Sequence, residues 1–353
     1  MKYIFITGSS GLVGSEAVSF FHQKGFKVIG IDNNFRKHLF GKIACTNWKR
    51  NYQIKKLKNF YHHNIDIRNF NKLERLFLKY RSKVKCIIHA AAQPSHDWAA
   101  KDPKTDFAVN SLGTLNLLEL TRKYCPKAVF IFVSTNKVYG DTPNRMKFTE
   151  TKTRFEIQKN NKFYQGIDES MSVDQSTHSL FGVSKSYADL ATQEYGRNIG
   201  LKTGVFRLGC ITGGSHSGAE LHGFLSYLVR ANLKKIPYTI YGYKGKQVRD
   251  NIHALDLVKC FWEFFKNPKK GEVYNIGGGR NNSCSVLEAM KIIEQKTKIK
   301  FTFKISKQNR VGDHIWYISN NKKFKKEYRN WKIKINLDLI INDIVNNNAN
   351  LKL

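Results

Sequence analysis

The stretch Thr7-Gly8-Ser9-Ser10-Gly11-Leu12-Val13-Gly14 decides the fold of this 353-residue chain. It follows an apolar run at Tyr3–Thr7 that is typical of a β-strand, and it precedes an amphipathic segment at residues 15–24. Glycines at this spacing permit a tight turn and let a pyrophosphate approach the backbone, where the free N–H groups and positive dipole end of a helix would bind it. The stretch therefore predicts a dinucleotide-binding turn between the first strand and the first helix.

The same alternation of β-rich apolar runs and amphipathic segments continues along the chain. Further apolar runs occupy residues 27–31, 86–89, 128–133 and 203–208, and another amphipathic segment occupies residues 114–124. This alternation predicts an α/β fold with a Rossmann-type, doubly wound parallel sheet. After about residue 210 the pattern loosens into loops, short helices and short strands, which predicts a smaller C-terminal substrate-binding lobe.

The predicted domain boundaries follow this change of pattern. Residues 1–210 form the dinucleotide-binding Rossmann domain, and we expect residues 249–266 to pack back on it. Residues 211–345 form the substrate-binding lobe. The Asn-rich tail, residues 346–353, is expected to fray.

A carboxylate after the second strand indicates which dinucleotide binds. Asp32 ends the run at Lys27–Ile31, 18 residues after Gly14, where it would accept hydrogen bonds from ribose hydroxyls and repel a 2′-phosphate. NAD is therefore favoured over NADP, although Arg36 keeps NADP open. The alternative is a structural loop followed by a turn aspartate.

Two further segments are candidates for lining the cofactor. Asp66, followed by Ile67, could contact the adenine, or it could belong to a surface turn. His89-Ala-Ala-Ala-Gln93 ends the fourth strand, and small residues such as Ala91 would let the cofactor lie against the backbone. On composition alone this second segment is merely a tight strand end.

Composition narrows the class of protein. The net charge is +33, but the lysines are spread along the chain and no nucleic-acid-binding signature accompanies them, so we expect no nucleic-acid partner. No apolar run approaches the roughly 18 residues of a membrane span. The six cysteines lack metal-ligand spacing. We therefore expect a cytoplasmic protein with reduced thiols, no membrane span and no metal.

Three downstream motifs identify a superfamily. They are Asn110-x-x-Gly113-Thr114-x-Asn116-Leu117-Leu118-Glu119, Ser134-Thr135 before Val138-Tyr139-Gly140, and the pair Phe181 and Lys185. With the glycine stretch, they resemble the extended short-chain dehydrogenases/reductases that act on nucleotide sugars. Residues 134–141, 216–223 and 245–250 are most similar to the CDP-paratose 2-epimerases, also called CDP-tyvelose epimerases. The resemblance covers about residues 1–320.

The resemblance implies a redox-neutral epimerase. In that family bound NAD oxidises one carbon of a nucleotide-activated sugar, the ketone turns over, and the hydride returns to the other face. Thr135 matches the residue that hydrogen-bonds the reacting oxygen, and Lys185 matches the lysine that binds the nicotinamide ribose. Asn110, in the first of these motifs, is likewise expected to bind the cofactor. The family also implies a role in lipopolysaccharide or other surface polysaccharide synthesis and a homo-oligomer.

Phe181 departs from the family's pattern, because it occupies the position of the catalytic tyrosine and cannot carry a proton. One explanation is a substitute group: His178, on the same face as Phe181 if that segment is helical, or His96, or Tyr139. A second is that Lys185 or a water acts directly. A third is a catalytically silent protein that binds NAD and a nucleotide sugar. The otherwise complete set of residues favours an active enzyme.

The two residues after Thr135 bear on the reaction type. Nucleotide-sugar 4,6-dehydratases usually have Asp-Glu there, whereas this chain has Asn136-Lys137. Without that acid and base, dehydration is disfavoured. Epimerisation at C2 is expected, with a 4-epimerase or a reductase as the alternatives.

The substrate diphosphate requires positive charge. Arg249 and Arg310 match the positions where the family clamps it, and the planar guanidinium suits phosphate oxygens. His216 and Glu220 lie in the first loop of the predicted lobe, where they would contact the sugar or the base. Together with His222 they do not by themselves predict a metal site.

Overall fold

The structure is a computed structural model that describes residues 2–215, 223–306 and 312–350. Contacts divide the chain into two units. Unit 1 consists of residues 1–138, 180–207 and 257–274. Unit 2 consists of residues 139–179, 208–256 and 275–353. Each unit is described in turn.

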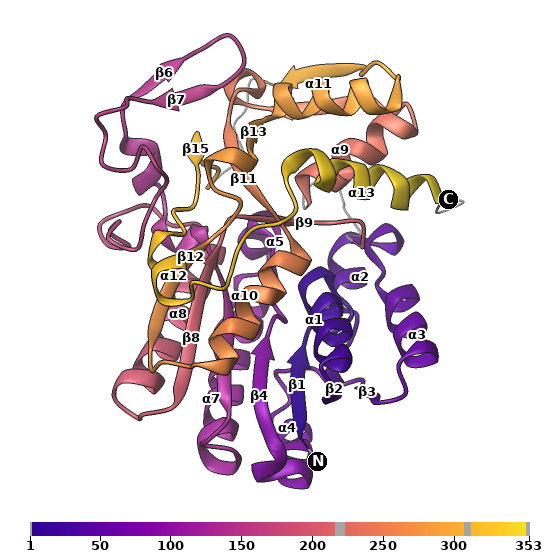
Figure 1. Ribbon diagram of the computed structural model, residues 1–353, viewed down its shortest axis with the longest axis vertical. Coiled ribbons are helices and arrows are strands. Elements are labelled where there is room, and N and C mark those ends of the chain that lie inside the picture. The colour runs from indigo at the N-terminus through magenta and orange to yellow at the C-terminus, as the bar shows by residue number, and fades with distance from the viewer. Residues whose placement is uncertain (1, 216–222, 307–311, 351–353) are drawn as a thin grey trace. The chain divides into compact units, whose positions relative to one another are not determined.

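A seven-stranded parallel sheet forms the centre of unit 1, in the order β12-β8-β5-β4-β1-β2-β3 (Figure 1). The strands are β1 (Tyr3–Thr7), β2 (Lys27–Ile31), β3 (Phe60–His63), β4 (Val84–His89), β5 (Val129–Thr135), β8 (Lys202–Leu208) and β12 (Glu272–Ile276). The chain thus crosses from β3 to β4 on the far side of β1. This order and the parallel strands confirm the predicted Rossmann-type sheet.

Helices cover both faces of the sheet because successive residues of each strand point to opposite sides. Phe5 packs with the core of α4 (Phe70–Tyr80), α7 (Gly113–Tyr124) and α8 (Leu180–Arg197). On the other helix layer, α1 (Leu12–Gln23) and α10 (Ala254–Lys266) meet through the rings of Phe21 and Trp262, whose centroids lie 5.8 Å apart. Unit 1 also contains α2 (Phe35–Phe40), α3 (Asn47–Lys56), α5 (His96–Lys101), α6 (Pro103–Phe107), the π-helical turn η3 (Ala108–Leu112) and the 3₁₀ turns η1 (Lys42–Ala44) and η2 (Arg81–Lys83).

Unit 2 has its own core. Helices α9 (Phe224–Leu233), α11 (Val286–Thr297) and α13 (Leu337–Asn350) pack together around Leu228, Ile293 and Ile341 (Figure 1). Its largest sheet joins β11 (Val248–His253) to β13 (Ser283–Ser285), β15 (Trp316–Tyr317) and β9 (Cys210–Thr212). Two small sheets pair β10 (Tyr238–Tyr241) with β14 (Phe303–Ser306) and β6 (Phe148–Glu150) with β7 (Phe155–Ile157), and α12 (Lys322–Glu327) follows β15.

The contacts group residues differently from the predicted boundary at residue 210. Residues 139–179 belong to unit 2 because they hydrogen-bond its later segments: the amide of Asn275 donates to Glu169 at 2.6 Å, and that of Ile315 donates to Asn144 at 2.7 Å. The segment of unit 1 that follows β11 is 257–274, which overlaps the expected 249–266. Helix α13 continues to Asn350, so residues 346–350 of the expected tail are helical.

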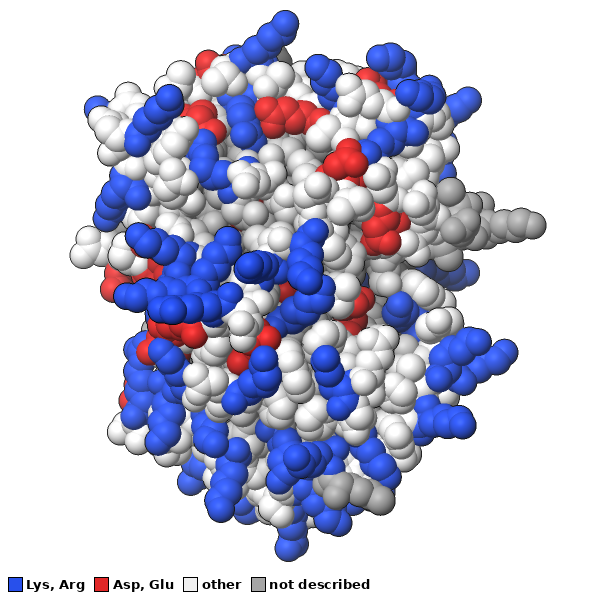
Figure 2. All heavy atoms as spheres, viewed as in Figure 1, with Lys and Arg blue, Asp and Glu red and all other residues white. Residues whose placement is uncertain are grey.

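The surface charge and the helices bear on what the sequence predicted. Figure 2 shows Lys and Arg side chains spread over the visible face with Asp and Glu between them, a distribution that gives a general positive field toward phosphate-bearing ligands. Within the described residues, no helix has both the length and the apolar character needed to cross a membrane.

Candidate active site

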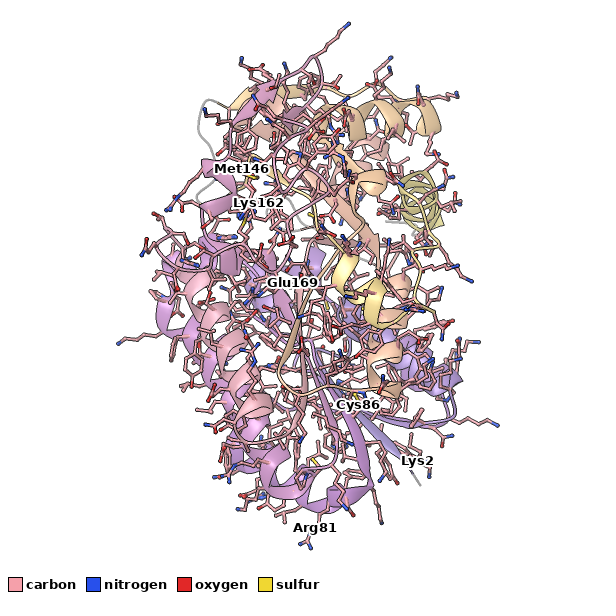
Figure 3. All side chains as sticks on the ribbon, turned by 60° about the vertical axis from the view of Figure 1, so that its left-hand side comes forward. Lys2, Arg81, Cys86, Met146, Lys162 and Glu169 are labelled. Atoms are coloured by element: carbon pink, nitrogen blue, oxygen red, sulfur yellow. The ribbon has the colours of Figure 1, made fainter. Side chains whose placement is uncertain are left out.

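The carboxyl ends of β1, β2 and β4 place the cofactor residues next to one another. Thr7 is in register with Ile31 on one side and with His89 on the other. The residues that follow these three positions are Gly8 after β1, Asp32 after β2 and Ala90 after β4. The glycine stretch therefore begins between the ends of β2 and β4. Lys2 and Arg81 lie beyond the opposite, amino ends of β1 and β4 (Figure 3). Ligands of doubly wound sheets bind at the carboxyl ends.

Two glycines of the loop cannot be replaced without moving the backbone. Gly8 has φ +67°, and a Cβ there would lie 2.8 Å from the amide nitrogen of Ala91. A Cβ on Gly14 would lie 2.0 Å from the carbonyl oxygen of Gly8. These contacts hold the first turn of α1 against the loop. They also bring the backbone at the end of β4, residues 90 and 91, directly against Gly8.

The start of α1 is suited to an anion. Gly11 is the N-cap residue and has extended φ and ψ angles of −73° and 176°, and this fully described turn has no side-chain cap. The first amide groups of a helix lack intrahelical acceptors, so they are open to a pyrophosphate oxygen here.

Asp32 joins the loop to the second strand. Its two carboxylate oxygens accept the amide of Ser10 at 2.9 Å and the amide of Asn34 at 2.7 Å. A carboxylate has about four acceptor positions, so lone pairs remain for the two ribose hydroxyls of a dinucleotide. Arg36 lies over the ring of Phe40, with its guanidinium 5.1 Å from the ring centroid.

Asp66 is more heavily committed than the sequence suggested. One oxygen accepts the backbone amide and Nε of Arg68, and the other accepts Nη2 of Arg68 at 2.7 Å and the side-chain amide of Asn33 at 2.9 Å. Burial alone would raise the pKa of Asp66, but the hydrogen bonds from Arg68 hold it below its ordinary value. A side-chain contact with adenine would therefore require Asp66 to give up one of these partners.

A buried chain of hydrogen bonds links β1, β4 and α7. The amide of Ala91 donates to Thr7 Oγ1 at 3.1 Å, Thr7 Oγ1 lies 2.8 Å from His89 Nδ1, and His89 Nε2 lies 2.9 Å from Thr114 Oγ1. Burial, aided by the charge of Lys185, holds the pKa of His89 well below its ordinary value. His89 is therefore neutral and positions the strand end. Sequence reasoning gave His89 and Thr114 no role, although both lie in quoted motifs.

Asn110 fixes the segment after β4 to α8. Its side chain exchanges hydrogen bonds with the backbone of Gln93 at 2.9 and 3.0 Å and donates to Asp106 at 2.9 Å and to Ser184 at 3.1 Å. It is buried, so its polar atoms are used within the protein. Gln93 ends the segment quoted from the sequence, whereas Asp106 and Ser184 had no sequence signal apart from the i, i+4 spacing of Asp106 and Asn110 in one helical turn.

Three of the predicted catalytic residues of unit 1, Thr135, Phe181 and Lys185, lie on β5 and α8. Phe181 and Lys185 are one helical turn apart, and both are buried. Lys185 Nζ donates to the carbonyl of Val133 at 2.9 Å, two residues before Thr135, and lies 4.1 Å from the centroid of the Phe132 ring. Burial lowers the pKa of Lys185 to about 7, against the opposing charges of Asp189 and Asp106. Thr135 Oγ1 accepts the amide of Lys137 at 3.3 Å.

The three proposed substitutes for the tyrosine have different surroundings. The ring of His96 meets the ring of Phe181 edge-on, with centroids 5.0 Å apart. His178 precedes α8, which begins at Leu180, so the idea that it shares a helix face with Phe181 is wrong. Its Nδ1 lies 3.0 Å from the carbonyl of Ser176, in unit 2. Tyr139, also in unit 2, is fully buried and donates its hydroxyl to Asn275 at 2.8 Å.

The predicted diphosphate residues belong to unit 2. Arg249 forms an ion pair with Asp313 and also donates to the carbonyl of Val248 at 2.7 Å. Its guanidinium is therefore anchored at the start of β11. Arg310, His216 and Glu220 lie outside the described residues. Within the described residues, no group of His, Cys, Asp and Glu side chains could hold a metal ion.

Comparison with known proteins decides the family. Residues 4–277 match the NAD dependent epimerase/dehydratase family. The chain belongs to this family. It is 37% identical over 309 residues to the CDP-paratose 2-epimerase of Salmonella typhi. The aligned region covers 85% of this chain and 86% of that protein.

Solved structures with lower identity share the fold. The UDP-glucose 4-epimerase of Thermus thermophilus, in complex with NAD, superposes with a TM-score of 0.79 at 22% identity and 99% coverage of both chains. The UDP-glucuronic acid 4-epimerase of Bacillus cereus, in complex with UDP-glucuronic acid and NAD, gives a TM-score of 0.80 at 20% identity, again with 99% coverage of both.

Family membership confirms the predicted superfamily, the enzyme class and NAD as the cofactor. The protein is an NAD-dependent enzyme of the nucleotide-sugar epimerase type. The residues present fit that cofactor: a loop that tolerates no Cβ at Gly8 and Gly14, an open helix start, and a carboxylate at Asp32 with acceptor positions left. The loss of the tyrosine hydroxyl at Phe181 is the point at which this member departs from the family's pattern.

Proposed function

We propose that the protein epimerises C2 of a CDP-linked deoxysugar with bound NAD and so supplies surface polysaccharide synthesis, including that of lipopolysaccharide. The observation that carries the proposal is an intact cofactor cradle beside Thr135 and Lys185 in a chain similar to a CDP-paratose 2-epimerase. NAD, when bound, would take up a hydride from the sugar carbon and return it to the other face.

The roles of the chain's residues follow from their positions. The amides at the start of α1 would bind the pyrophosphate, and Asp32 would accept the ribose hydroxyls. The hydroxyl of Thr135 would donate to the reacting sugar oxygen. Lys185 would contact the nicotinamide ribose. Ala91 would leave room for the cofactor, and Asn110 would act by positioning the segment after β4.

The residues after Thr135 support epimerisation rather than dehydration. Asn136 and Lys137 begin a 3₁₀ turn, η4 (Asn136–Tyr139), directly after β5. An amide and an amine at these positions cannot act as the Asp-Glu acid and base pair of the dehydratases. A 4-epimerase or a reductase remains as the within-class alternative, and Phe181 specifically favours a silent binding protein as the alternative outside it.

Product analysis separates these functions. The purified protein would be incubated with CDP-paratose, CDP-tyvelose and UDP-linked hexoses in D₂O, and the sugars followed by NMR. The proposal expects inversion at C2 of the CDP sugar without deuterium at C2, because the hydride does not exchange with solvent. Inversion at C4, or turnover that consumes NADH, would replace the proposal with one of the alternatives. Binding without any turnover would identify a silent protein.

The substrate diphosphate would bind at Arg249 and Arg310, with His216 and Glu220 near the sugar or base. Arg249 is already hydrogen-bonded to Val248 and paired with Asp313, so the substrate would have to share or displace the carboxylate. The Arg249→Ala variant should weaken nucleotide-sugar binding by about 10- to 100-fold with little change in NAD affinity, because a charged hydrogen bond contributes roughly 1.5–3 kcal/mol. Calorimetric titration with each ligand checks this, and equal losses for both would indicate misfolding.

The expected homo-oligomer would form through α8. All exposed residues between Leu180 and Gln193 of this fully described helix are apolar: Leu180, Val183, Tyr187 and Leu190, with exposures of 48%, 50%, 37% and 54%. Their 3-4-3 spacing is that of a helix-packing stripe. Because the chain carries a net charge of +33, an uncharged face is where two copies can meet with least repulsion.

Light scattering after size-exclusion chromatography tests this interface. The proposal expects an oligomer of the wild type and a monomer of Leu190→Lys. Leu339→Lys, at a residue 49% exposed on α13, is the matched control and should leave the mass unchanged.

A cytoplasmic location is supported by the six cysteines, all of which are free thiols.

A further inference from the structure

The family's proton carrier is missing, whereas the lysine one helical turn further along α8 is present. Phe181 and Lys185 lie on one face of α8 at i and i+4, and their exposed fractions are 6% and 3%. The phenylalanine ring offers no donor or acceptor. Lys185 is therefore the nearest group on this helix face that can exchange a proton.

Lys185 is held in place without a counter-ion. Its Nζ donates to the carbonyl of Val133 at 2.9 Å and lies 4.1 Å from the ring centroid of Phe132, and within the described residues it forms no ion pair. The Val133 carbonyl lies on β5, two residues before Thr135. The amine is thus tied to the strand end that carries the hydroxyl expected at the reacting oxygen.

The two carboxylates whose charges act on Lys185, those of Asp189 and Asp106, accept hydrogen bonds from other groups. Asp189 accepts Nε and Nη2 of Arg207 at 3.0 and 2.9 Å, Ser134 Oγ at 2.6 Å and Gln193 Nε2 at 2.7 Å. These four bonds fill its acceptor positions. Asp106 accepts Gln93 at 2.7 Å and Asn110 at 2.9 Å. Neither carboxylate hydrogen-bonds the amine, so their charges offset only part of its desolvation.

The remaining titratable groups around Lys185 do not offset the desolvation of its amine. His89 on β4 is kept neutral by burial, and His96 on α5 packs against Phe181. Arg207 on β8 is neutralised by Asp189. Burial accordingly lowers the pKa of Lys185 to about 7, which matches the requirement that an acid–base group titrate near the working pH.

We propose that Lys185 itself accepts and returns the proton of the reacting sugar hydroxyl. In the family this is the role of the tyrosine at the position of Phe181. This inference rests on the proposed function. In the oxidative half-reaction the C–H and O–H bonds of the carbinol break and the C=O bond forms. The hydride goes to bound NAD and the proton goes to the neutral amine of Lys185.

The second half-reaction is the reverse on the other face of the sugar. The carbonyl carbon regains the hydride while the ammonium of Lys185 returns the proton to the oxygen. Electrons and protons balance over the cycle, and no external oxidant or base is needed. The hydroxyl of Thr135 keeps the oxygen in place throughout.

Four variants test the assignment: Lys185→Arg, Phe181→Tyr, the double variant, and Lys123→Arg as the matched control. Lys123 is an exposed lysine on α7. Arginine keeps the positive charge and hydrogen-bond donors at position 185 but cannot lose a proton. We expect Lys185→Arg to retain NAD within about fivefold and to lose at least 100-fold in kcat, and we expect the double variant to recover at least tenfold because the tyrosine restores a proton carrier.

A second measurement does not depend on turnover. In protein labelled with ¹³C at lysine Cε, the resonance absent from Lys185→Arg belongs to Lys185, and its shift should titrate near pH 7 in the NAD-free protein. The proposal is overturned if that resonance titrates above pH 9, or if Lys185→Arg keeps kcat within threefold of the wild type. A wild type that turns over no nucleotide sugar overturns the proposed function as well, whereas an active Lys185→Arg variant overturns only the role of Lys185.

Discussion

The cofactor end and the catalytic end of unit 1 differ in what enforces their motifs. At the cofactor end, Gly8 and Gly14 are required by backbone contacts that a single Cβ would break. At the catalytic end, Phe181 replaces a tyrosine while Lys185 keeps its bond to Val133. Backbone packing therefore constrains the glycine loop independently of the chemistry. At position 181, packing against His96 is satisfied by a buried aromatic ring, and only the chemistry requires its hydroxyl. A sequence can change at the second kind of site and still fold around it.

The largest effect is expected at the cofactor end, from Gly14→Ala. The new Cβ would lie 2.0 Å from the carbonyl oxygen of Gly8, so the loop or the start of α1 must move. Overpacking of this kind costs on the order of 3 kcal/mol, and we expect NAD affinity to fall at least 100-fold.

Calorimetric titration with NAD measures this loss, and circular dichroism reports whether the protein still folds. Gly25→Ala is the matched control, since a Cβ there has nothing within 4 Å, although its φ of +84° adds some backbone strain. If Gly14→Ala bound NAD as tightly as the control, the close approach of helix and loop would not be what shapes the cofactor site.

The next effect compares two carboxylates of the cofactor end. Asp32 has acceptor positions left for ribose, whereas Asp66 is filled by Arg68 and Asn33. Asp32→Ala should weaken NAD binding by about 10- to 100-fold, the value of one charged hydrogen bond, while Asp66→Ala should weaken it by less than about threefold. Fluorescence titration of both variants with NAD measures the two losses of affinity. Equal losses would support the adenine contact that the sequence predicted for Asp66.

The sequence predicted the features that depend on local spacing. The strand, glycine turn and helix at the N-terminus lie together within the first 23 residues, and Asp32 follows the next strand, so their pattern is readable in the chain. Phe181 and Lys185 were found through the resemblance to the family's motif, and their i and i+4 positions on α8 need no tertiary information.

The features that the sequence missed depend on contacts between distant segments. Asn110, Gln93 and Ser184 meet only when the segment after β4 packs on α8. Residues 139–179 join unit 2 through bonds such as that between Tyr139 and Asn275, 136 residues away. The helix start after His178 also could not be read, because the segment Thr-His-Ser-Leu at 177–180 fits a cap as well as a helical turn.

A smaller effect is expected in the pH dependence of stability at the catalytic end. The pKa of Lys185 is about 7 in the folded protein and about 10.5 in the unfolded chain, so between these values the unfolded chain binds more protons at this residue. The free energy of unfolding therefore rises with pH across this window, by up to about 1.4 kcal/mol per pH unit from this group. The NAD-free wild type should gain stability relative to Lys185→Met between pH 7 and pH 9.

Urea denaturation at pH 7, 8 and 9 measures that difference. Lys123→Met serves as the control, because the hydrogen bonds that Lys123 makes to Tyr124 and Glu74 raise its pKa above its ordinary value. Such a group stays protonated in both states over this range, so the control should run parallel to the wild type. If the stability of Lys185→Met also changed with pH in parallel with that of the wild type, the pKa of Lys185 would be the same in the folded and unfolded protein. The catalytic end would then contain no lysine with a lowered pKa.

The smallest effect is expected from His96→Gln, which asks whether the catalytic end has acquired a second proton carrier. His96 meets Phe181 edge-on at 5.0 Å, a ring contact whose loss costs about 0.5–1.5 kcal/mol of stability. If Lys185 carries the proton, kcat should stay within about threefold of the wild type, and the pH profile should keep its inflection near neutrality. Thermal melting and the pH dependence of kcat, measured on the same preparation, separate the two roles. A roughly 100-fold slower turnover that also removes the inflection near neutrality would assign the proton to the histidine, because a lost ring contact lowers the melting temperature but leaves the titrating group in place.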